Sequence, residues 1–109
     1  MRHFIADHYA AVWRPDGRCE LYLRNITVVD RLRTHDLTRI GLPGDTMRAL
    51  WREAHKIVTR GELTGIHELT ESPFLLWIDG RTGAVLDRWE AMDPWSHIVE
   101  RLREANHAA

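Results

Sequence analysis

Seven histidines raise the question of whether this chain of 109 residues binds a metal ion. No two of them have the i, i+4 spacing that places a ligand pair on one helix face, and no His-Glu-x-x-His sequence occurs. His97 and Glu100 are three residues apart, but a lone pair of this kind is too common to indicate a site. The glycines form neither a P-loop nor a dinucleotide-binding fingerprint. We therefore expect no metal ion and no cofactor.

His67 and Glu68 are the best candidates for acid–base chemistry. Histidine titrates near neutral pH, and the pair lies in a polar, irregular segment of the kind that often carries catalytic groups. Adjacent residues do not by themselves form a catalytic dyad, and no substrate-binding motif accompanies them. A small enzyme that uses this pair is one alternative. We assign no catalytic residue, and we expect a binding protein rather than an enzyme.

Four basic residues are spaced by four along the clearest predicted helix: Arg48, Arg52, Lys56 and Arg60. This spacing makes them neighbours along one ridge of the helix surface. Like charges at i, i+4 destabilise a helix by a few tenths of a kcal/mol per pair. The ridge is either a solvated face or a docking surface for an anionic partner. We predict docking, and the partner is then an acidic protein surface or a nucleic acid.

The charge distribution favours a protein partner over a nucleic acid. Residues 1–60 carry a net charge of +4 and residues 61–109 carry −5, so two copies of the chain could complement one another. The sequence pI of about 6.6 is low for a specific DNA-binding protein. No apolar run is long enough to span a membrane, and the N-terminal residues lack the apolar core of a signal peptide. We expect a cytoplasmic protein without a membrane partner.

Two β-hairpins are predicted from repeated turn sequences. The first joins residues 4–14 to 18–24 through Pro15, Asp16 and Gly17, and the second joins residues 73–78 to 84–89 through a turn from Asp79 to Gly83. The lone Cys19 excludes an intramolecular disulfide and is expected to be buried on its strand. Residues 26–31 are rich in β-branched side chains, which favours a third strand over a short helix.

Two helices are predicted from apolar spacing and capping signals. One begins after Pro43-Gly44 and ends near Gly61, and the other begins at Asp93-Pro94. We predict that their apolar stripes bury four residues in particular: Leu50, Trp51, Ile98 and Leu102. Residues 62–72 are polar and could form a short strand with a loop.

The fold class that fits this order is α+β. We predict a single domain, residues 1–109, with a mostly antiparallel sheet built from the two hairpins and two α-helices packed on one face. Residues 72–104, SPFLLWIDGRTGAVLDRWEAMDPWSHIVERLRE, resemble the closing strand–strand–helix portion of thioredoxin-like domains. The resemblance implies a thioredoxin-like α/β fold as the alternative. The paired redox cysteines of that family are missing, so its redox chemistry is not implied.

The functional hypothesis is a small accessory or regulatory module that acts through protein–protein contacts. We expect it to self-associate, with a homodimer as the simplest form, and to bind itself or a protein with an acidic surface. The first alternative is a nucleic-acid-binding protein that uses the basic ridge. The second is the small enzyme with a His/Glu acid–base pair.

Overall fold

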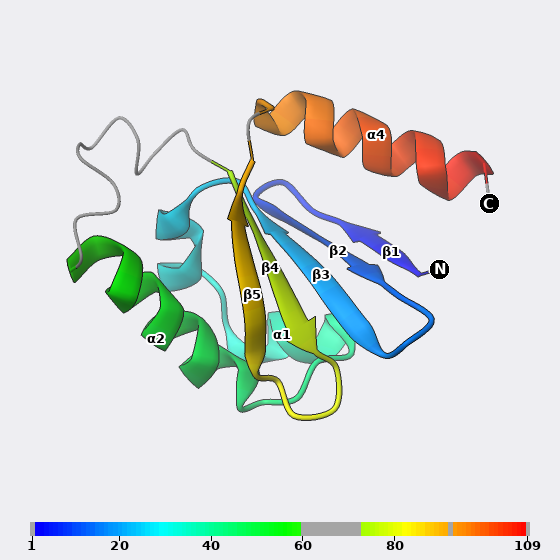
Figure 1. The fold of residues 1–109 in the computed structure, drawn as a ribbon. Coiled ribbons are helices and arrows are strands. Elements are labelled where there is room, and N and C mark those ends of the chain that lie inside the picture. Colours follow the sequence, from blue (N-terminus) through cyan, green and yellow to red (C-terminus); the bar gives the residue numbers. More distant parts are fainter. Residues whose placement is uncertain (1, 60–72, 92, 109) are drawn as a thin grey trace.

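The computed structural model describes residues 2–59, 73–91 and 93–108 as a five-stranded sheet with helical segments around it (Figure 1). In chain order the elements are β1 (His3–Ile5), β2 (Tyr9–Trp13), β3 (Arg18–Leu23), η1 (Ile26–Asp30), α1 (Thr34–Ile40), α2 (Thr46–Thr59), β4 (Phe74–Asp79), β5 (Val85–Glu90) and α4 (Trp95–Ala108). A sheet with separate helical segments confirms the predicted α+β class. No helix among these is long and apolar enough to cross a membrane.

The sheet is an antiparallel meander in which every strand pairs with its neighbour in the chain, in the order β1-β2-β3-β4-β5. Both predicted hairpins are present, as β2–β3 and β4–β5. Residues predicted as the first strand divide into β1 and β2, because the chain turns at Ala6–His8. The closing hairpin and helix are present, but no parallel pairing occurs within the described residues, so the α/β alternative is not supported.

The two faces of the sheet follow from the alternation of side chains along β3. Cys19, Leu21 and Leu23 point to one side, here called the core face, where they pack with apolar residues of η1, α1 and α2. The alternate residues of β3 point to the other side, here called the outer face, and α4 packs there against β1, β2 and β3 (Figure 1). The prediction that both helices share one face is therefore wrong. A helix stripe shows that a helix is buried, but not on which side of a sheet.

Residues 26–30 form the 3₁₀-helix η1 instead of the predicted strand. Asn25 precedes it in extended conformation, and its side-chain oxygen accepts a hydrogen bond from the backbone N–H of Thr27 at 3.0 Å. This cap gives the backbone N–H of Thr27 an acceptor at the helix start. In a strand, that N–H would need an acceptor on a neighbouring strand. Ile26, Val28 and Val29 are all buried on the core face. A short apolar run of this kind fits either structure, and the cap favours the helix.

Helix α1 was not predicted. Its start is closed by Asp36, whose carboxylate accepts the backbone N–H of Arg33 at 2.8 Å. Its end is Gly41, which has a φ of 102° in the left-handed region that closes many helices. The same conformational demand explains Gly17 in the first hairpin turn and Gly83 in the second, with φ values of 90° and 79°.

The predicted core residues have three different outcomes. Leu50 and Ile98 are buried, as is Cys19. Leu102 is half-buried on the outer face. Trp51 is 56% exposed, so the prediction that it is buried is wrong. It follows Leu50 at the margin of the apolar stripe of α2, and no neighbouring element covers it fully.

These adjacent residues of α2 allow a direct test of the packing. Leu50→Ala should lower the free energy of unfolding by about 2–5 kcal/mol, because it leaves a cavity in the core. Trp51→Ala should lower it by about 0.5 kcal/mol or less, since it changes an exposed position. Urea denaturation of both variants would measure the difference. Equal losses would mean that α2 does not dock on the sheet by its Leu50 side.

Candidate functional site

The predicted basic ridge lies on the exposed side of α2. Arg48, Arg52 and Lys56 are exposed, and Arg60 lies outside the described residues. The Nζ atom of Lys56 is 3.7 Å from Oε2 of Glu53. The other carboxylate oxygen, Oε1, accepts a hydrogen bond from Arg88 of β5 at 3.0 Å. The structure thus places the ridge in solvent and connects its Lys56 end to β5. Its binding role stays a prediction.

The histidine hypotheses gain no support from the described part of the chain. His67 and Glu68 lie outside it. His97 and Glu100 are both exposed on α4 and line an open hollow on the helix surface. No group of three or more potential ligands among His, Cys, Asp and Glu forms a metal site within residues 2–59, 73–91 and 93–108.

A buried carboxylate that the sequence analysis did not single out occupies the centre of the outer face. Glu20 lies in the middle of β3, directly opposite Val12 of β2 and Trp77 of β4. Only 3% of its surface is exposed. Strict alternation along β3 forces the side chain onto the outer face, and β2, β4 and α4 then enclose it. A buried charge of this kind requires partners for both of its oxygens.

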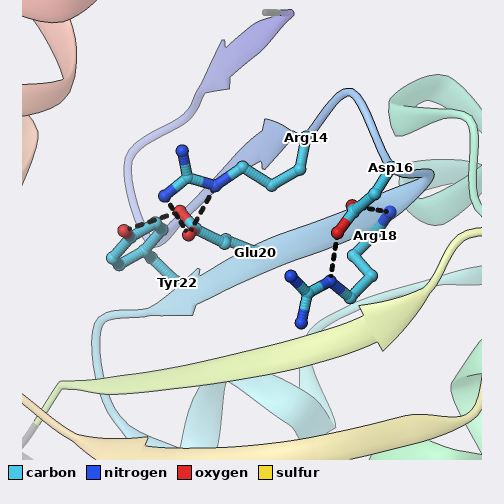
Figure 2. Close-up of polar contacts among 5 residues, drawn as sticks. All are labelled: Arg14, Asp16, Arg18, Glu20 and Tyr22. Atoms are coloured by element: carbon cyan, nitrogen blue, oxygen red, sulfur yellow. Dashed lines mark hydrogen bonds and ion pairs between the residues drawn. The ribbon is translucent and has the colours of Figure 1, made fainter.

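Arg14 and Tyr22 provide those partners (Figure 2). The Nε and Nη2 atoms of Arg14 donate to Oε1 of Glu20 at 2.8 and 2.6 Å. The hydroxyl of Tyr22 donates to Oε2 at 3.1 Å. Arg14 follows the end of β2, and Tyr22 lies two residues after Glu20 on the same side of β3. Since both carboxylate oxygens are engaged, Glu20 holds the two strands in register and is poorly placed to act as a base.

The buried position of this cluster also perturbs its titration. Burial raises the pKa of Tyr22 to about 12, and the negative charge of Glu20, together with its hydrogen bond, acts in the same direction. On the core face, burial raises the pKa of Cys19 to about 12, again with the help of Glu20. A thiol of such a high pKa is protonated at neutral pH, so Cys19 is a packing residue and not a nucleophile.

A small hollow of about 320 Å³ separates the cluster from α4. Its walls are formed by residues of β1–β3 on one side and of α4 on the other: His3, Val12, Arg14, Glu20, Tyr22, Ile98, Arg101, Leu102 and Ala105. The Nδ1 atom of His3 is buried and makes no hydrogen bond to a described residue. Arg14, Glu20 and Tyr22 bind one another on the sheet side of the hollow, so this cluster supports the fold.

Next to the cluster, the first hairpin turn places two arginines over an aromatic ring. Asp16 accepts the backbone N–H of Arg18 at 3.1 Å and its Nε at 2.7 Å, as Figure 2 shows. The backbone hydrogen bond is the main reason why the pKa of Asp16 is lowered. The guanidinium of Arg18 then lies 4.8 Å from the ring centre of Trp77, and that of Arg14 lies at 5.8 Å. Trp77 is therefore half-covered by charged groups of the same protein.

Strand β5 is the most exposed apolar part of the sheet. Leu86 is 53% exposed and Trp89 is 60% exposed, although both belong to a strand. The register shifts between Trp77 and Ile78, which makes Leu86 an extra residue in β5 and marks a bulge. The far edge of β5 pairs with no other strand of the described residues. An open strand edge beside an exposed tryptophan is a surface suited to another polypeptide.

Comparison with known proteins assigns no family. No protein-family model matches the chain, and no curated protein or solved structure matches it significantly. Function is therefore inferred from the surfaces described above.

The Glu20 cluster predicts an unusual alkaline titration. The folded pKa of Tyr22 lies above the ordinary value of about 10, so the stability that this phenol contributes is present below pH 10 and is lost as the pH rises from about 10 to about 12. In a Tyr9→Phe background, ultraviolet absorbance should show Tyr22 ionising near pH 12 while the protein is folded. Adding Glu20→Gln should lower this pKa, because the neighbouring charge is removed. Ionisation near pH 10 before unfolding would contradict the buried cluster.

Proposed function

We propose that this protein is a small binding module that acts through protein–protein contacts and self-associates. The observation that carries the proposal is the edge of β5, which pairs with no strand in the described part of the chain, with Trp89 and Leu86 exposed on the same strand. A free edge presents backbone donors and acceptors that water satisfies in the monomer and that another strand can satisfy in a complex. Tryptophan is among the residues that most often dominate the energy of such interfaces.

The other edge of the sheet is less suited to this role. Strand β1 contains only the three residues His3–Ile5, whereas β5 contains six. Helix α4 packs against β1 and helix α2 packs against β5, so the length of the strand distinguishes the two edges. We therefore assign the self-association surface to β5.

The exposed cations of α2 supply a second surface, for an acidic partner. Arg48 and Arg52 form no ion pair with a described residue, whereas Lys56 is paired with Glu53. A module that binds itself through β5 and an acidic protein through α2 fits an accessory or regulatory role. We place this role in the cytoplasm.

Two exposed tryptophans of similar accessibility provide the test of self-association. Sedimentation velocity over a range of concentrations should show a reversible dimer of the natural protein. Trp89→Ala should weaken it at least about tenfold, because the residue lies at the edge that pairs. Trp51→Ala, on α2, should leave it unchanged. A protein that sediments as a monomer at every concentration would refute the proposal.

Nucleic acid is the second candidate partner, and the exposed cations of α2 are the observation that favours it. A mobility-shift assay with single-stranded and duplex oligonucleotides at low and high salt would decide, because phosphate contacts make affinity fall steeply with salt. We expect weak binding that is removed equally well by salt and by the double variant Arg48→Glu/Arg52→Glu. Affinity that persists at physiological salt and depends on these two residues would favour the nucleic-acid function instead.

A further inference from the structure

We propose that two copies of this chain join their β5 strands antiparallel, with the two-fold axis at Trp89, so that Arg88 lies opposite the partner's Glu90. This inference rests on the proposed self-association and specifies its register. It would give a continuous sheet of ten strands, five from each copy. Charge, backbone direction and side-chain placement each lead to this register.

The backbone of β5 shows which residues are available at the edge. The N–H of Ala91 donates to the carbonyl oxygen of Pro73 at 2.9 Å, so these two residues form a hydrogen-bonded pair between β5 and β4. Hydrogen-bonded and non-hydrogen-bonded pairs alternate in an antiparallel ladder. Trp89, opposite Leu75, therefore also directs its backbone groups toward β4. Arg88 and Glu90 direct theirs away from β4, toward the edge, where the N–H of Arg88 donates to the carboxylate of Asp87 at 2.8 Å.

A two-fold axis perpendicular to the sheet restricts the possible registers. Residues that are paired across the axis lie on the same face of the sheet, and consecutive residues of a strand lie on opposite faces. One residue must therefore lie opposite its own copy at the axis. An axis at Asp87, Arg88 or Glu90 places that charged residue opposite its own copy, and like charges directly opposite are destabilising. An axis at Trp89 places one tryptophan opposite the other. Among these positions it is also the one that pairs Arg88 with the partner's Glu90 and Glu90 with the partner's Arg88.

The hydrogen-bonding pattern agrees with this register. Arg88 and the partner's Glu90 both present backbone groups at the edge. Each such pair can exchange two hydrogen bonds once the N–H of Arg88 leaves the exposed carboxylate of Asp87 for the partner's carbonyl oxygen. Trp89 then meets the partner's Trp89 as a non-hydrogen-bonded pair, in which side chains approach most closely. This contact would cover Trp89, one of the largest exposed apolar side chains in the described part of each copy.

The side chains divide between the two faces in a way that suits the contact. Trp89 lies on the outer face, on the same side as Leu75, with which it pairs. Arg88 and Glu90 lie on the core face, and Glu53 of α2 holds the guanidinium of Arg88 at 3.0 Å. A guanidinium has five N–H donors, so it can bind Glu53 and a second carboxylate together. The contact between Arg88 and Glu53 thereby positions the charge at the open edge.

Complementary charge reversal tests the register. In Arg88→Glu the partner's Glu90 would meet a second carboxylate, and in Glu90→Arg the partner's Arg88 would meet a second guanidinium. Each variant alone should dimerise at least about tenfold more weakly than the natural protein, since two attractive pairs become repulsive. A one-to-one mixture should recover dimers, because every opposed pair in the mixed dimer has opposite charges. Sedimentation velocity of each variant and of the mixture measures this.

A control separates the contact from general effects of charge. Arg103→Glu reverses an exposed charge on α4 and should leave the dimer unchanged. Circular dichroism before mixing establishes that each variant is folded.

The register and the proposed function fail in different ways. If the natural protein dimerises and Trp89→Ala weakens the dimer, but mixing restores nothing, the register is refuted and self-association stands. If the natural protein is monomeric throughout, both are refuted. If Glu90→Arg alone leaves the dimer unchanged while Arg88→Glu abolishes it, Arg88 does not act through the partner's Glu90, and the proposed pairing is again refuted.

Discussion

The burial of Glu20 on the outer face of β3 is the constraint around which the rest of the structure is arranged. β3 is the central strand, and helices cover its region of the sheet on both sides. Alternation then requires a side chain at this position to lie under α4, and a carboxylate there must be neutralised. Arg14 neutralises it from the end of β2, and Tyr22 binds its second oxygen. Glu20 therefore joins the end of β2 to β3 on the face of the sheet that α4 covers.

Much of the fold follows from short-range signals, so its hairpin turns and two of its helices could be predicted from the sequence. Pro15-Asp16-Gly17 and the turn from Asp79 to Gly83 fix the hairpins, because their conformations favour few other residues. The spacing of apolar residues marks α2 and α4 for the same local reason. The prediction of a strand at residues 26–30 was wrong, because a run of β-branched residues fits a strand or a turn of helix equally well. The cap from Asn25 favours the helix.

Features that depend on the tertiary arrangement could not be predicted from local sequence. Nothing local shows that α4 packs on the face opposite α2, or that Trp51 lies beyond the reach of the sheet. The importance of Glu20 depends on β3 being central, which is a property of strand order. A weak signal did exist for β5: three charged residues within a strand are typical of an edge, where charge discourages unwanted pairing. Arg48, Arg52 and Lys56 are exposed, as their helical spacing relative to Leu50 suggests, and the binding role of the ridge stays a prediction.

The same edge charges that discourage unwanted partners can select a particular one, because in one register they attract. Amide hydrogen exchange of β5, followed by NMR at increasing protein concentration, tests this most directly. The amide of Trp89 should be protected at every concentration, since it bonds to β4 in the monomer. The amide of Glu90 should exchange quickly in dilute protein and become protected as dimers form. The amide of Arg88, which donates to the exposed carboxylate of Asp87 in the monomer, should gain protection over the same range of concentration. Fast exchange at both residues in concentrated protein would contradict pairing through β5.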